Sequence, residues 1–173
     1  MLRWIIGKRL DAVERDLGES ADYLRFMVGA SLPAFLKFTK VLPVAAYRRR
    51  LPLDAHHVAR LVATRDEDCG TCVRVEIRIA KKAGVSLDVI RAVIDRAADR
   101  LPAALADVYR FTECVVTARS DDAPLRARIR ERYGDAALAE LALAIAACRV
   151  FPIVKRALGF STSCAQADVA SAV

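Results

Sequence analysis

The sequence has few of the residues that interrupt helices, with seven glycines and six prolines among 173 residues. It contains no low-complexity tract, and 55% of its residues are hydrophobic and 28% charged, which is the composition of a globular protein. Sustained alternation of apolar and polar residues is missing, as are Asn-Gly hairpin dipeptides, so we expect no β-sheet. Because the length suits one hydrophobic core, we predict a single domain.

The sequence also lacks an uninterrupted apolar run near the ~18 residues that span a bilayer. The apolar part of the first stretch, MLRWIIGKRL, is shorter than the core of a signal peptide. We therefore expect no membrane span and a cytoplasmic location. Cysteines stay mostly reduced there, so thiols, redox centres or ligands are expected rather than a disulfide framework. The five cysteines are Cys69, Cys72, Cys114, Cys148 and Cys164.

Lysine is scarce, since only six of the 28 basic residues are Lys although the net charge is +7. The basic runs YRRRLP and RARIRERY carry an aromatic residue at one end only and match no nucleic-acid-binding motif. We therefore predict a solvated basic surface and no nucleic-acid partner.

Apolar residues recur at helical spacing along almost the whole chain, which predicts an all-α protein. Ser31 is expected to cap one helix and Asp54 another, because short polar side chains accept hydrogen bonds from free backbone N–H groups. The acids at 66–68 should end the second of these helices and start the next. That next helix is expected to close at Gly84, and Ser86 should cap the one that follows.

The last helical segment, AALAELALAIAACRVF, is apolar nearly all round. We expect a short basic helix to end at Gly134, Asp135 to cap this apolar helix, and Pro152 to kink or end it. A helix with so little polar surface is usually buried on more than one side. We therefore predict a homo-oligomer in which this helix packs against another subunit; the alternative is a central core helix.

Two cysteines and a glutamate lie close together in the stretch DEDCGTCVRVE, residues 66–76. Cys69 and Cys72 are three residues apart and Glu76 follows four later, so all three share one face of a helix. In the first turn of that helix, free N–H groups and the helix dipole would favour a thiolate on Cys69. These are the requirements of a redox dithiol.

Two other interpretations of the pair remain open. A zinc site would need two further ligands, but there is no second Cys-x-x-Cys and the only histidines are adjacent, at 56 and 57. We therefore predict no metal. The pair could instead be incidental buried cysteines, since free cysteine is often buried. Cys114 and Cys148, within apolar helical runs, are expected in the core, and Cys164 in an exposed tail.

The stretch HVARLVATRDEDCGTCVRVEIRIAKKAGVS, residues 57–86, resembles the core helix pair of the carboxymuconolactone decarboxylase and AhpD-like alkylhydroperoxidase superfamily. The family motif is Glu, eleven residues, Cys-x-x-Cys, three residues, His, then a small residue and Gly-[Val/Leu]-[Ser/Thr]. The matching positions here are Cys69, Cys72, Ala80, Gly84, Val85 and Ser86. The resemblance covers roughly residues 40–160. It implies an AhpD-like helical bundle over residues 41–173, after an N-terminal helical extension over residues 1–40.

The sequence departs from the motif at two positions. His57 stands where the family has its glutamate, and Glu76 stands where the family has its histidine. We expect His57 to reach Glu76, because an imidazolium would offset a carboxylate charge that otherwise raises the thiol pKa, and the pair could relay a proton. The alternatives are an ion pair of Glu76 with Arg78 or Arg65, and a His57 that is only a buried or exposed helix residue.

The resemblance implies a thiol oxidoreductase, a peroxidase of the alkylhydroperoxidase kind. A peroxide or disulfide would be reduced as Cys69 and Cys72 close to a disulfide, and an external thiol donor would reopen it without a cofactor. The family order of events implies that Cys72 attacks and Cys69 resolves. Family members form trimers or hexamers, so a trimer, dimer or hexamer is expected. The alternatives are a non-catalytic scaffold or redox sensor and, third, a lactone decarboxylase, whose chemistry does not need two cysteines.

Overall fold

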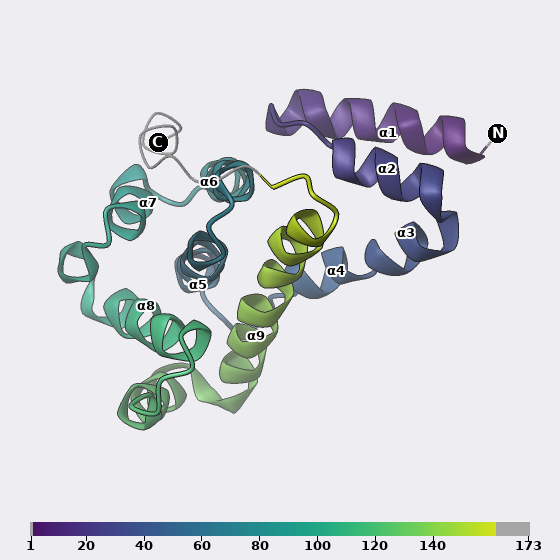
Figure 1. Cartoon of the computed structure of the whole chain (residues 1–173). Coiled ribbons are helices and arrows are strands. Elements are labelled where there is room, and N and C mark those ends of the chain that lie inside the picture. Colours follow the sequence, from purple (N-terminus) through teal and green to yellow (C-terminus); the bar gives the residue numbers. More distant parts are fainter. Residues whose placement is uncertain (1, 162–173) are drawn as a thin grey trace.

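The computed structural model describes residues 2–161, and within this range the chain is all-helical, as predicted, with no strand (Figure 1). The elements in chain order are α1 (Leu2–Leu17), α2 (Asp22–Ala30), α3 (Leu32–Phe38), α4 (Val41–Ala45), α5 (Leu53–Asp66), α6 (Gly70–Ala83), α7 (Leu87–Ile94), the short 3-10 helix η1 (Ala98–Arg100), α8 (Ala103–Val116) and α9 (Ala123–Ala157). Cys164, which we expected in an exposed tail, lies outside the described residues.

Helix α5 is the centre of the fold and packs against α6, α7, α8 and α9 (Figure 1). All residues from 55 to 64 are buried. A helix surrounded in this way should be apolar, yet it carries His56, His57, Arg60 and Thr64. Buried polar groups cost free energy unless they find partners. The contacts of these four residues therefore decide what this part of the core can do.

Residues 2–38, here called the N-terminal arm, lie to one side of the other helices (Figure 1). The arm has a small apolar cluster of its own, separate from the main core. Its buried members are Ile6, Leu10, Ala21, Val28 and Phe35. Ion pairs then attach the arm to α6: the Glu19 carboxylate accepts hydrogen bonds from Arg74 Nε at 2.6 Å and from Arg78 Nη1 at 3.1 Å. The arm therefore rests on the helix that follows the cysteine motif.

Several helix ends follow the predicted local chemistry. The side chains of Ser31 and Ser86 each accept a hydrogen bond from the backbone N–H three residues on, at 3.3 Å. Gly84 ends α6 with a left-handed backbone (φ 93°), which glycine adopts without strain. The prediction for Asp54 is wrong, because Pro52 occupies the cap position. Asp54 lies in the first turn, where its negative charge still faces the positive end of the helix dipole.

Helix α9 is broken at Gly134, as predicted, where the backbone turns to φ 83° and ψ 168°. Of the kink or end expected at Pro152, the end is wrong, since the helix runs on to Ala157. Pro152 and Lys155 are both buried, so packing against the fold holds the turns beyond the proline although one backbone hydrogen bond is lost. Asp135 pairs with Arg130 across the break.

Helix α9 is also the one described helix that is long and apolar enough to cross a membrane by length and composition, a test that core helices of water-soluble proteins pass as well. In the fold, 44% of its apolar window is buried. Leu143 and Ile153 on this helix remain largely exposed. The helix buried on all sides is therefore α5, not the Ala-rich segment that we weighed for this position.

Candidate functional site

The two cysteines of the motif lie where α6 begins. Cys69 occupies the N-cap position, with an extended backbone (φ −118°, ψ 92°), rather than the first turn as predicted. Cys69 has no exposed surface, whereas Cys72, inside the first turn, is partly exposed. Both are free thiols. The turn from α5 into α6 passes through Asp68, which has a left-handed backbone (φ 49°).

The environment shifts the pKa values of the two thiols in opposite directions. The Cys72 thiol donates a hydrogen bond to the Cys69 sulfur, which is the main reason that the pKa of Cys69 falls to about 6. Burial opposes this shift, while the Cys72 backbone amide and the charges of Lys155 and Arg156 support it. The pKa of Cys72 is raised, because this hydrogen bond, burial and the nearby Cys69 charge all favour its protonated form. At neutral pH the pair therefore holds one thiolate, on Cys69, and one thiol, on Cys72.

A buried carboxylate fixes the turn in front of Cys69. Glu67 accepts a hydrogen bond from Arg149 Nε at 2.5 Å and another from Arg156 Nη2 at 3.1 Å. Arg156 also donates to the Glu67 backbone carbonyl. These contacts attach the last turns of α9 to the residues just before Cys69. The sequence indicated only that Glu67 ends a helix, because its partners lie more than 80 positions further along the chain.

Lys155, near the end of α9, is a buried cation beside the dithiol. Its Nζ lies 5.9 Å from the centroid of the Tyr23 ring, within the range of a cation–π contact. Its positive charge lowers the pKa of both Cys69 and Cys72. Among the described residues Lys155 makes no salt bridge with a carboxylate. Sequence analysis missed this residue, because nothing in the local sequence around 155 points to the cysteine motif.

The N-terminal arm reaches the same place through Tyr23. The pKa of the Tyr23 phenol is raised by burial first and then by negative charge on Cys72 and Cys69, so the ring lies near both sulfurs. Edge-on aromatic contacts continue from Tyr23 to Phe38, at 6.2 Å between ring centroids, and from Phe38 to Phe151 of α9, at 5.5 Å. The Tyr23 ring of the arm therefore lies near the dithiol, at one end of a chain of aromatic contacts that reaches α9.

Glu76 is buried, and its partner is Arg60 of α5. Arg60 Nε donates to Oε2 and Nη2 to Oε1, both at 2.9 Å, so the pair is bidentate. Each side chain is only 8% exposed. Arg60 Nη1 donates in addition to the Ala45 carbonyl at 2.9 Å. The positive charge that offsets the carboxylate near Cys72 is therefore a guanidinium, and not the imidazolium that the sequence led us to expect.

The two arginines proposed as alternative partners of Glu76 are engaged elsewhere. Arg65 donates to Tyr109 and to Glu113, each at 3.0 Å. Arg78 binds Glu19 of the arm. The general idea of an ion pair with arginine is right for Glu76, but the partner is the buried Arg60 and neither of these two arginines.

His57 is buried on α5 and neutral at physiological pH. Burial is the main reason that its pKa falls to about 4, and the charges of Arg60 and Arg48 lower it further. The Nδ1 atom has no hydrogen-bond partner within the described structure, and the ring meets that of His56 edge-on at 5.3 Å. The described interactions connect His57 to Arg60 by charge and Arg60 to Glu76 by hydrogen bonds; a direct pair between His57 and Glu76 is not among them.

The other described cysteines are buried, as predicted. Cys148 of α9 is part of the main core, and burial raises its pKa, with the Glu76 charge as a smaller cause. Cys114 of α8 is 3% exposed, and its pKa is raised by burial and by the contact of its sulfur with Asp121. Within residues 2–161 no group of three or more His, Cys, Asp or Glu side chains is arranged to hold a metal ion.

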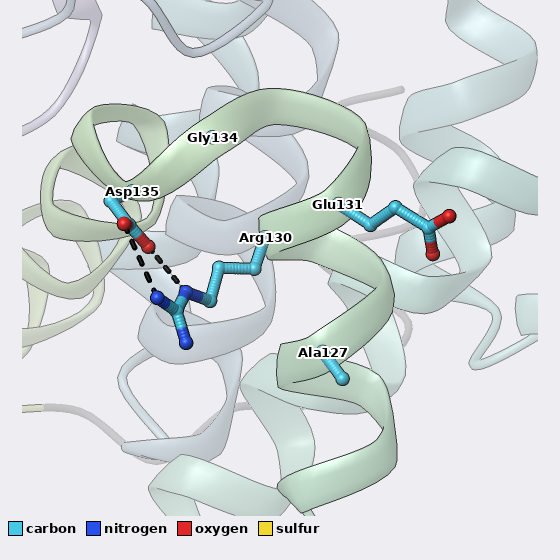
Figure 2. A pocket seen from close by; sticks show the side chains of 5 residues that line it. All are labelled: Ala127, Arg130, Glu131, Gly134 and Asp135. Atoms are coloured by element: carbon cyan, nitrogen blue, oxygen red, sulfur yellow. Dashed lines mark hydrogen bonds and ion pairs between the residues drawn. The ribbon is translucent and has the colours of Figure 1, made fainter.

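A surface hollow lies at the Gly134 break of α9, away from these residues (Figure 2). Arg130 points across it to Asp135, while Glu131 points in another direction (Figure 2). The hollow is lined by Ala127, Arg130, Glu131, Gly134 and Asp135, and by none of the predicted site residues. The candidate site is therefore the dithiol with its surrounding charged residues, and not this hollow.

Comparison of the chain with protein-family models, with curated proteins and with solved structures found no match. The fold and the site thus define an all-α protein with a partly buried dithiol, and any function must be argued from the residues themselves.

Proposed function

We propose that the protein is a thiol oxidoreductase of the alkylhydroperoxidase kind, which reduces peroxides or disulfides through Cys69 and Cys72. The observation that carries this proposal is the pair of free cysteines at the start of one helix, Cys69 at the N-cap of α6 and Cys72 in its first turn, and the opposite shifts of their pKa values support it. A nucleophilic thiolate beside a protonated partner is what a two-step dithiol reaction requires.

The pKa shifts support Cys69 as the attacking sulfur, the reverse of the order implied by the resemblance. The Cys69 thiolate attacks one peroxide oxygen, an S–O bond forms, the O–O bond breaks, and an alkoxide leaves and takes a proton from solvent. The Cys72 thiol then attacks the Cys69 sulfenic acid and water leaves with the Cys72 proton. The dithiol has lost two electrons and the peroxide has gained them.

An external dithiol completes the cycle, and no cofactor is needed. Its thiolate attacks the Cys69–Cys72 disulfide through a mixed disulfide, and its second thiol releases the reduced protein. Because the low pKa of Cys69 makes this sulfur the better leaving group, Cys72 is the sulfur that the donor attacks. Cys72 is also the more exposed of the two.

Glu76 and His57 have separate roles in this proposal. Glu76, with its charge offset by Arg60, helps to keep Cys72 protonated until it attacks. His57 is neutral at physiological pH. It is therefore available as a proton acceptor, as the relay predicted from the motif requires.

The proposal is tested by peroxide consumption with a dithiol donor. Cys69→Ser should abolish turnover, and Cys72→Ser should slow it strongly, because only the external dithiol can then attack the Cys69 sulfenic acid. Cys114→Ser is the matched control, since Cys114 is buried outside the site. His57→Ala should slow the reaction if the relay operates. Equal rates in the wild type and both motif variants would overturn the proposal.

One observation favours a redox sensor as a second candidate, namely that Cys69 has no exposed surface and Tyr23 of the arm lies near the pair. A sensor would form the Cys69–Cys72 disulfide with one equivalent of peroxide but would show no sustained consumption when the donor is present. The same assay therefore separates the two functions.

A further inference from the structure

We propose that Lys155 is the cation that holds the Cys69 thiolate in the reduced protein, and that it thereby sets how readily the dithiol is oxidised and reopened. This inference rests on the proposed redox role of the pair and goes beyond it, because it assigns a charge from a distant helix to the control of that site.

The position of Lys155 follows from the contacts of its neighbour. Arg156 bonds both the carboxylate and the backbone carbonyl of Glu67, two residues before Cys69. The last turn of α9 is therefore fixed against the start of α6. Tyr23, whose ring lies under the Lys155 ammonium, reaches this place from α2 of the arm.

The burial of Lys155 requires a partner. The residue is 7% exposed, and an ammonium group out of water costs several kcal/mol unless an anion is near. The two buried carboxylates in this region are occupied, Glu67 by Arg149 and Arg156, and Glu76 by Arg60. A contact with an aromatic face offsets only part of the cost. Among residues 2–161, the Cys69 thiolate is the remaining buried anion of this region.

The other charged and titratable groups around Cys69 act in known directions. Cys72 donates a hydrogen bond, Arg156 adds a second positive charge, and Glu76 acts on the Cys72 side of the pair. Tyr23 stays protonated because its pKa is raised. The Lys155 charge acts on both sulfurs.

A stabilised thiolate favours the reduced form, so the disulfide becomes a better oxidant and is reopened more easily. In the reopening step an external dithiol loses two electrons and becomes a disulfide, and the protein disulfide gains them as the Cys69 thiolate and the Cys72 thiol. The inference thus points to an ordinary dithiol as the electron donor.

The test is the pH dependence of Cys69 alkylation by iodoacetamide, followed by mass spectrometry in the full-length protein. The wild type should show a midpoint near pH 6. Lys155→Met should raise the midpoint by about one pH unit, which lowers the thiolate population about tenfold below both midpoints. Lys155→Arg should stay close to the wild type. Lys37→Met, on an exposed lysine of α3, is the matched control and should change nothing.

A second readout is the disulfide equilibrium with a glutathione buffer. Lys155→Met should favour the protein disulfide about tenfold more than the wild type, because the thiolate loses the same stabilisation. An unchanged midpoint and an unchanged equilibrium would overturn the inference. Should Lys155→Met fail to fold, Lys155→Gln carries the same test. Neither readout uses peroxide, so a protein that shows both shifts but consumes no peroxide would keep this inference and lose the proposed function.

Discussion

At the scale of the residue, the site depends on which buried charges are paired and with what. Glu76 and Arg60 satisfy one another with two hydrogen bonds, and Glu67 is held by two arginines. The sequence showed that an acid follows Cys72 at helical spacing. It could not show Arg60 as the partner, because that pairing depends on how α5 and α6 cross.

Breaking the Glu76 and Arg60 pair should destabilise the protein strongly. Arg60→Met leaves a buried carboxylate without its partner, and loss of one member of a buried ion pair costs about 3–5 kcal/mol. The double variant Arg60→Met with Glu76→Met should lose less, because no uncompensated charge remains. Urea unfolding measures both values. A single variant as stable as the wild type would show that the pair is not buried as described.

The buried histidines predict a particular dependence of stability on pH. The pKa of His57 in the folded state is about 4 against an ordinary value of 6.5, so between these values the unfolded chain binds more protons. The stabilisation is therefore complete above about pH 6.5 and is lost as the pH falls toward 4, at up to about 1.4 kcal/mol per pH unit for each such histidine.

Urea unfolding between pH 7 and pH 4 checks this dependence. His57→Leu should show a weaker loss than the wild type, because one titrating group is gone, and His56 should account for part of what remains, since its pKa is lowered to about 3, chiefly by burial. Equal slopes in the wild type and His57→Leu would contradict the assignment of His57 as a buried neutral imidazole.

At the scale of the element, local chemistry predicted the ends of helices but not their packing. Ser31, Gly84 and Ser86 act as expected because a cap involves only neighbouring residues. Pro152 does not break α9, because tertiary contacts override a local preference. The arm was predicted as a helical extension without a role, and the structure places its Tyr23 near the dithiol.

Release of the arm should expose the dithiol. Glu19→Gln removes the carboxylate that binds Arg74 and Arg78 on α6. If these pairs contribute about 1 kcal/mol, local opening becomes about fivefold more populated, and alkylation of Cys72 should accelerate by a similar factor at constant pH. Mass spectrometry after a timed iodoacetamide pulse measures the rate.

Asp11→Asn is the control for the arm, because the Asp11 ion pair with Arg25 lies within the arm itself. This variant should alkylate at the wild-type rate. Equal rates for Glu19→Gln and the wild type would show that the arm does not limit access to the pair.

At the scale of the whole molecule, the all-α class could be predicted because helical periodicity runs through nearly the entire chain. The choice of the central helix could not. Composition offered the Ala-rich segment as a central helix only as the alternative to a subunit interface, and α5, with four buried polar residues, occupies the centre. The composition of a helix gives its hydrophobicity directly, whereas its burial depends on how the other helices pack around it.

The prediction of a homo-oligomer can be tested on α9. Leu143 is 43% exposed on this apolar helix, and a second copy of the chain would bury it. We expect light scattering after size-exclusion chromatography to give a mass above 19.0 kDa, and Leu143→Glu to shift the protein toward the monomer. A monomer for the wild type at all concentrations would contradict the prediction.

The central claim is that Cys69 and Cys72 form a reversible redox pair. The most direct measurement is peptide mass spectrometry of the protein after one equivalent of peroxide, and again after addition of a dithiol. The account predicts a Cys69–Cys72 disulfide in the first sample, both thiols restored in the second, and Cys114 and Cys148 unchanged throughout. Oxidation without a bond between Cys69 and Cys72, or no oxidation of either, would contradict it.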